Sequence, residues 1–117
     1  MAAGLSGIST HILDTSRGRP AAGIPVTLEQ HAEGSWRELF TQKTDADGRV
    51  KQFLAVDVPL EVAHYRLTFD TRAYFEELEI EGLYPLVQIT FSVRDKAGHY
   101  HIPLLLTANG YTTYRGS

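Results

Sequence analysis

Hydrophobic and polar residues alternate along most of the chain, the pattern of strands that bury one face against a core. In residues 24–30, for example, Ile24, Val26 and Leu28 fall on one face and polar residues on the other. Segments rich in glycine, aspartate, asparagine or proline separate these stretches and indicate turns. The pattern predicts strands over residues 8–14, 24–30, 36–44, 49–54, 64–70, 86–94, 100–107 and 111–115.

The alternation stops at residues 71–78, where helix-forming residues follow Asp70 and Thr71. Either residue is suited to cap a helix, so we expect one short helix between the fifth and sixth strands. Pro25 near the start of its strand favours an edge or a first-residue position. Short strands with turns at near-regular spacing predict an all-β sandwich. No repeat or linker divides the chain, so we expect a single domain over residues 1–117.

Composition excludes several kinds of partner. A chain of 117 residues with 43% hydrophobic and 21% charged residues is typical of one globular domain. Its net charge of -3 is too small to indicate a polyanion, so we expect neither nucleic-acid nor membrane binding. There is no cysteine for a disulfide or thiol nucleophile. The first residues do not resemble a secretory signal, so we expect a soluble, cytoplasmic protein, or a peroxisomal one in a eukaryote.

Histidines are the first candidates for chemistry, because imidazole exchanges protons near neutral pH. His11 lies in mid-strand on the face opposite Ile8 and Ile12. His99 and His101 share one face of a later strand. Taken singly, each of these is more typical of a surface or structural histidine, and the other two histidines carry no functional signal.

Arg49 directly follows a tight turn at residues 45–48. Most such arginines are solvated, but one held by a turn is also able to bind a carbonyl-rich ligand through two parallel hydrogen bonds. His99 and His101 could chelate a metal, but no third ligand is evident nearby, so we expect none. Residue types alone therefore lead to a β-sandwich with three candidate polar residues, His11, Arg49 and His101.

Three segments together point to a known family. They are LSGISTHILD at residues 5–14, TDADGR at residues 44–49 and YRGS at residues 114–117, supported by GRPA at 18–21 and HYHIPLL at 99–105. On these motifs the chain closely resembles the 5-hydroxyisourate hydrolases, also called transthyretin-related proteins. The terminal YRGS is the most specific motif, since it separates the hydrolases from the hormone-carrying transthyretins of the same fold.

The resemblance implies a transthyretin-like sandwich of two four-stranded sheets that assembles as a homotetramer, a dimer of dimers. The site would lie at the dimer–dimer interface, where residues far apart in sequence converge on an outward sheet face covered by a partner subunit. The residues implied by motif are His11, Arg49, His101 and Ser117 as catalytic groups, with His11, Arg49, Tyr114, Arg115 and Gly116 binding substrate.

The implied reaction opens a ring acyl C–N bond of 5-hydroxyisourate and gives 2-oxo-4-hydroxy-4-carboxy-5-ureidoimidazoline in urate degradation. We expect His101 or His11 to be the base that takes the proton of water, and Arg49 to hold substrate carbonyls. Tyr114 would wall the ring, and Ser117 would orient a histidine or water through its hydroxyl or terminal carboxylate. No cofactor is implied.

Three alternatives remain open at this point. A transthyretin-type carrier would bind a small ligand without turnover, although histidines and arginine are poor lining for an apolar channel. A monomeric interaction module would leave these residues merely solvated. A metal-dependent hydrolase would use His99, His101 and His11 as ligands.

Overall fold

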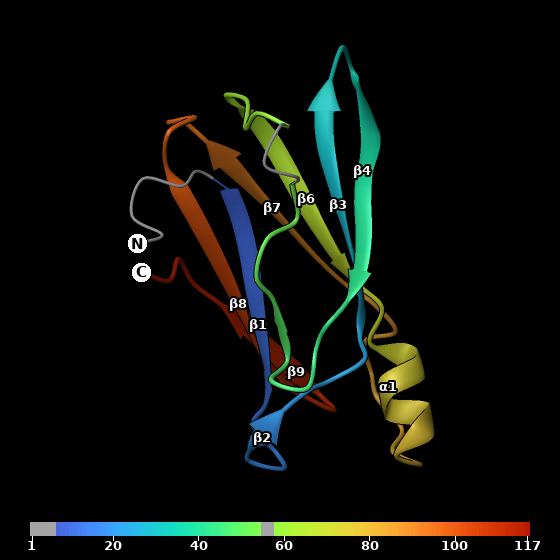
Figure 1. Ribbon diagram of the computed structural model, residues 1–117. Coiled ribbons are helices and arrows are strands. Elements are labelled where there is room, and N and C mark those ends of the chain that lie inside the picture. Colours follow the sequence, from blue (N-terminus) through green and yellow to red (C-terminus); the bar gives the residue numbers. More distant parts are fainter. Residues whose placement is uncertain (1–6, 55–57) are drawn as a thin grey trace.

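Two β-sheets pack face to face in the computed structural model, which describes residues 7–54 and 58–117 (Figure 1). The first sheet contains β1 (Gly7–Asp14), β2 (Arg19–Pro20), β5 (Arg49–Val50), β8 (His99–Thr107) and β9 (Gly110–Thr113). The second contains β3 (Pro25–Ala32), β4 (Ser35–Lys43), β6 (Ala63–Phe69) and β7 (Val87–Val93). The helix α1 (Arg72–Glu77) lies at one end of the sandwich. The expected all-β sandwich with a short helix is confirmed.

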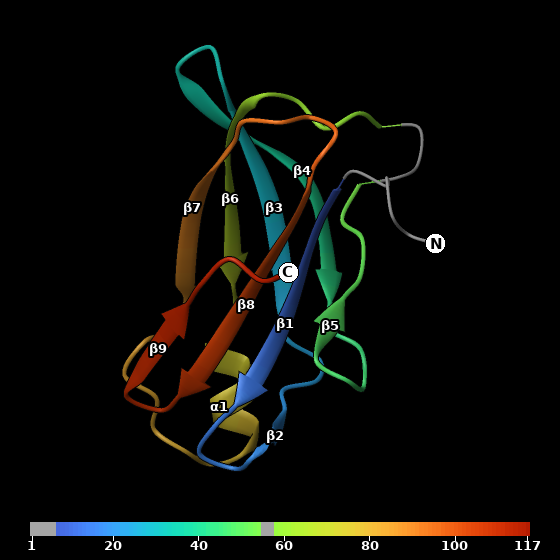
Figure 2. The ribbon, with the colours of Figure 1, turned by 90° about the vertical axis from the view of Figure 1, so that its left-hand side faces the viewer.

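Strand order determines which residues share the outer face of the first sheet. Its order is β2-β1-β8-β9, with β5 also paired to β1. The β1–β8 pair is parallel, whereas the other pairs in the described residues are antiparallel. Figure 2 looks onto this sheet and shows the C-terminal segment crossing from β9 over β8 toward β1. The chain end therefore lies on the outer face.

The core lies between the two sheets and is formed by alternate residues of each strand. Ile8, Ile12 and Leu104 of the first sheet and Leu28 and Leu67 of the second are all 0% exposed. These are positions that the period-two pattern assigns to the inner face. Truncation of such a side chain to alanine typically costs about 2–5 kcal/mol, so the inner face holds the strand register firmly.

Two details differ from the expected pair of four-stranded sheets. The first sheet gains a fifth strand, because the two residues of β2 pair with Leu13 and Asp14 at the end of β1. The strand expected over residues 49–54 ends at Val50. Phe53 and Leu54 are both buried, and consecutive residues of a regular strand cannot face the same side.

The helix begins where the sequence indicates, but its first turn is held differently. Thr71 occupies the N-cap position without a side-chain capping bond. Its Oγ1 donates instead to the carbonyl of Tyr84, at 2.6 Å, and so ties the helix start to the following loop. Pro25 is the first residue of β3, one of the two positions expected for it. Across residues 7–54 and 58–117 no helix is long and apolar enough to cross a bilayer.

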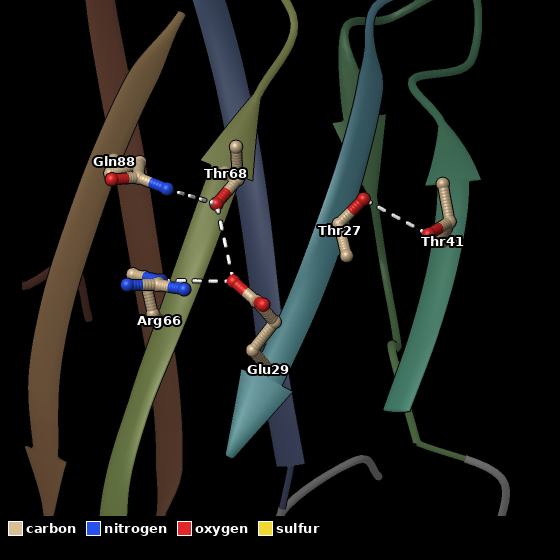
Figure 3. Close-up of polar contacts among 6 residues, drawn as sticks. All are labelled: Thr27, Glu29, Thr41, Arg66, Thr68 and Gln88. Atoms are coloured by element: carbon tan, nitrogen blue, oxygen red, sulfur yellow. Dashed lines mark hydrogen bonds and ion pairs between the residues drawn. The ribbon is translucent and has the colours of Figure 1, made fainter. Parts of the chain in front are cut away.

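The outer face of the second sheet carries polar side chains that satisfy one another (Figure 3). Arg66 Nε donates to Glu29 Oε1 at 2.9 Å, in an ion pair that links β6 to β3. Further hydrogen bonds on this face join Thr27 with Thr41, Thr68 with Glu29, and Gln88 with Thr68. Cross-strand pairs of this kind stabilise a solvated sheet face.

A glycine turn fastens β5 to β1. Asp45 Oδ1 accepts the backbone N–H groups of Asp47, at 2.9 Å, and Arg49, at 3.0 Å. Gly48 has a φ of 74°, and its carbonyl accepts the N–H of Ile12 at 2.7 Å. A Cβ on Gly48 would lie 2.5 Å from the Ile12 carbonyl oxygen. Only glycine fits both the backbone conformation and this close approach.

We predict that Gly48→Ala destabilises the protein more than Gly23→Ala does. Gly23 also has a positive φ, of 79°, but a Cβ there meets nothing within 4 Å. The control should lose about 1–2 kcal/mol from backbone strain alone, and Gly48→Ala more, because the turn must move from β1. Urea unfolding followed by circular dichroism measures both values. Equal losses in the two variants would contradict the close-contact argument.

Candidate active site

Four polar side chains gather on the outer face of β1 and β8. Ser9 and His11 lie two apart on β1, and His99 and His101 lie two apart on β8, so each pair shares a face. The parallel register sets Ser9 opposite His101. The sequence expectation that His11 and His101 face away from the core is confirmed by the buried Ile8, Ile12, Tyr100 and Ile102 on the other face.

A surface pocket of about 320 Å³ lies over Ser9, His99 and His101, whereas His11 is not among its lining residues. Three of the predicted site residues line it, namely Arg49, His101 and Ser117. The pocket is completed by Ser9, Thr10, Lys51 and His99. Its lining residues are all of polar or charged types, and two of them, Arg49 and Lys51, carry side-chain cations, which suits a ligand rich in carbonyl oxygen.

Arg49 stands beside His11 because β5 pairs with β1 at this position. Partial burial lowers the pKa of His11 most, and the Arg49 guanidinium lowers it further. A hydrogen bond with the Asp47 backbone and the carboxylates of Asp47 and Asp45 oppose these effects. The net result favours a neutral imidazole at neutral pH.

The pKa of His101 is lowered by the same two leading causes, burial and Arg49. Burial is the largest cause that lowers its pKa, followed by Arg49 and then by His11 and His99. A neutral imidazole can accept a proton, and the nearby guanidinium can stabilise a developing negative oxygen. A neutral imidazole and a guanidinium thus lie on one face, a combination that can support hydrolysis.

The chain terminus lies directly against His101. Gly116 N–H donates to the His101 carbonyl at 2.8 Å, in an isolated bridge between the two residues. A Cβ on Gly116 would lie 2.5 Å from His101 Cδ2, so any other residue here would have to displace the His101 ring. Arg115 stacks its guanidinium over the Tyr100 ring, 4.5 Å from the centroid. Tyr114 is 56% exposed.

Sequence reasoning left out three residues of this pocket, Ser9, Thr10 and Lys51, and gave a fourth, His99, a different role. Ser9 Oγ lies 2.8 Å from His101 Nδ1 and 3.0 Å from His99 Nε2. Lys51 lines the pocket beside Arg49. Period-two alternation places Ser9 on the face of His11, but no local signal indicates that β8 is the neighbouring strand. For His99, the sequence suggests only a surface or structural histidine or a metal ligand.

Two other observations help to decide where on the molecule the candidate active site lies. No group of three metal-ligating side chains is found among residues 7–54 and 58–117. A larger hollow of about 770 Å³ lies beside α1 and β2, with Arg17 and Tyr74 in its wall, and it contains none of the predicted site residues. The smaller pocket is therefore the better candidate for chemistry, because the titratable cluster lies there.

Comparison with known proteins agrees with this geometry. Residues 8–116 match the HIUase/Transthyretin family. The chain belongs to this family. A "5-hydroxyisourate hydrolase" of Salmonella typhi is 42% identical over 117 residues, which cover 100% of this chain and 85% of the relative.

Solved structures of both branches of the HIUase/Transthyretin family share the fold. The 5-hydroxyisourate hydrolase of Klebsiella pneumoniae superposes with a TM-score of 0.83 at 39% identity, covering 96% of this chain and 100% of that one. Transthyretin from Sparus aurata superposes with a TM-score of 0.84 at 29% identity, covering 93% and 95%. The backbone is therefore common to both, and the residues of the site must distinguish them.

We predict that Arg49→Gln raises the pKa of both His11 and His101. The substitution removes a positive charge that disfavours the imidazolium form, so each histidine should hold its proton to a higher pH. NMR titration of the imidazole resonances measures this shift. Arg94→Gln, an exposed substitution outside the cluster, is the matched control. Unchanged titration in Arg49→Gln would show that this guanidinium does not act on the histidines.

Proposed function

We propose that this protein hydrolyses 5-hydroxyisourate to 2-oxo-4-hydroxy-4-carboxy-5-ureidoimidazoline, a step of urate degradation. The observation that carries the proposal is the meeting of His11, Arg49 and His101 on one outward face, beside a polar pocket. Relatives that carry this activity in their names align with the full length of the chain. Hydrolysis of a cyclic amide needs a base for water and a cation for the carbonyl oxygen, and this cluster holds both.

We propose His101 as the general base. It lines the pocket, and both burial and the neighbouring Arg49 lower its pKa, so it is neutral at neutral pH. Water would give a proton to His101 as its oxygen attacks the ring carbonyl. The acyl C–N bond would then break with its electron pair on nitrogen, and this nitrogen would take the proton back from the His101 imidazolium, which leaves the base neutral again. His11, adjacent to Arg49, would position the water or the substrate.

The remaining residues of the proposed site would bind the substrate or orient water and the histidines. Arg49 would hold the carbonyl oxygen as it becomes negative, through its planar pair of donors. Ser117 lines the pocket and would orient water or a histidine. Gly116 brings the terminal segment onto His101, and Tyr114 and Arg115 would wall the substrate ring.

We propose that the protein works as a homotetramer in which a partner subunit covers this face. The pocket is shallow and open in a single chain, whereas catalytic electrostatics gain strength when water is excluded. The outer strands β7 and β9 leave sheet edges available for pairing between subunits. A dimer of dimers would cover the histidine face and complete the site.

The substitutions His101→Asn, Arg49→Ala and His11→Asn test the assignment. We expect turnover to fall about 10²- to 10⁴-fold for loss of the base and about 10²- to 10³-fold for loss of the cation. His11→Asn should also lower turnover, and His64→Asn, on the other sheet, should leave it unchanged. The assay follows the ultraviolet absorbance of 5-hydroxyisourate made freshly from urate. If the wild-type protein does not accelerate its decay, the carrier function becomes the better hypothesis.

Deletion of residues 114–117 tests the role of the chain end. Residues 114–117 lie outside the named strands and the core cluster, so the truncated protein should keep its circular dichroism spectrum and lose turnover. Sedimentation equilibrium on both proteins examines assembly in the same experiment. A full-length protein that sediments as a 13.0 kDa monomer would contradict the partner-covered site. An active truncated protein would remove the terminus from the mechanism.

A further inference from the structure

Ser9 lies between two imidazole rings on the outer face of the first sheet. Its Oγ is 2.8 Å from His101 Nδ1 and 3.0 Å from His99 Nε2, and the residue is 6% exposed. A hydroxyl carries one proton, so it donates to one ring nitrogen and accepts an N–H from the other. The protonation states of the two rings are therefore coupled through Ser9.

The coupling is a product of the parallel β1–β8 register. Ser9 stands opposite His101, while Gly7 stands opposite His99. The side chain of Gln52 lies where a Cβ of Gly7 would be, while the His99 ring is directed at Ser9. His101 is half-buried at the pocket, whereas His99 is exposed. The three side chains thus lead from the candidate site to the surface.

We propose that Ser9 and His99 position the base by holding His101 in the tautomer that carries its proton on Nδ1. His101 Nδ1–H donates to Ser9 Oγ, and the Ser9 hydroxyl donates to His99 Nε2. This arrangement leaves the lone pair of His101 Nε2 for the attacking water. The inference rests on the proposed hydrolase function and adds two positioning residues to it.

The charges around the pocket favour this direction of the hydrogen bonds. A lone pair directed into an electropositive pocket is more favourable than an N–H bond directed there. Arg49 and Lys51 make the pocket electropositive. Among residues 7–54 and 58–117, the charged and titratable side chains that act on His101 or line the pocket with the two rings are His11, Arg49 and Lys51.

The same chain of hydrogen bonds makes the base sensitive to the exposed histidine. When His99 is protonated, its Nε2–H must donate to Ser9, and the hydroxyl then donates to His101 Nδ1. His101 is left with its proton on Nε2 and cannot accept one from water. Activity therefore requires that both His99 and His101 be unprotonated at the start of the reaction.

Kinetic variants test this coupling. Ser9→Ala should lower kcat about 10- to 100-fold with little change in KM, as for other residues that orient a functional histidine. Ser9→Thr keeps the hydroxyl and should stay within about threefold of wild type. His99→Gln offers a carbonyl acceptor that does not titrate. Its kcat at pH 8 should exceed that of Ser9→Ala, because an acceptor for the Ser9 hydroxyl is kept, and its activity should fall less steeply with acid. His64→Gln is the control.

Ring-nitrogen NMR gives a readout that does not depend on activity. In ¹⁵N-labelled wild-type protein at alkaline pH, the shifts of His101 should be those of the Nδ1–H tautomer, and Ser9→Ala should lose this preference. An Nε2–H tautomer in the wild type would overturn the proposal, even for an active enzyme. So would a Ser9→Ala variant with normal kcat. If the wild-type protein shows the Nδ1–H tautomer but no turnover, the hydrolase function fails instead.

If Ser9→Ala does not fold, two measurements still test the proposal. They are the His101 tautomer in the wild-type protein and the pH dependence of His99→Gln, a substitution at an exposed position. If activity falls equally steeply with decreasing pH in His99→Gln and in the wild type, the proposed coupling is wrong.

Discussion

The parallel pairing of β1 with β8 supports both the core and the candidate site. It joins residues 92 positions apart, such as Ser9 and His101, and it also sets Ile8 beside Tyr100. Alternation sends Ile8 and Tyr100 into the core and the polar pair to the outer face. A slip of one residue would exchange the two faces and expose the apolar side chains. The burial that stabilises the sandwich therefore also holds the histidines in register.

Two glycines bring further segments to this face, each for a steric reason. Gly48 lets the turn before β5 approach the carbonyl of Ile12, and so sets Arg49 beside β1. Gly116 lets the chain end pass over the ring of His101. Both segments reach the site through backbone hydrogen bonds, which place them with the precision that catalysis needs. The terminal motif thus has a structural explanation in addition to its resemblance to a family.

The two outer faces of the sandwich differ in their electrostatics. On the second sheet, Arg66 is paired with Glu29, and the surrounding polar groups bond to one another. On the first sheet, Arg49 faces imidazoles whose pKa values are lowered by burial and by its own charge. A cation beside neutral bases is less stable than an ion pair, but it is ready to act on a carbonyl and a water molecule. The proposed hydrolysis uses this difference.

Local sequence was sufficient for the features that depend on the backbone nearby. The alternation identified the strands, the Asp-Gly turn placed Arg49 at a strand start, and the loss of alternation indicated the helix. Resemblance to a family added the convergence of His11, Arg49 and His101, which spacing alone could not provide. Tertiary structure decided the rest: the parallel neighbour of β1, the short strand β2, the early end of β5, and the position of Ser9 between two imidazoles. These features depend on which strands pack together, and that choice is made by burial of the whole inner face rather than by any local pattern.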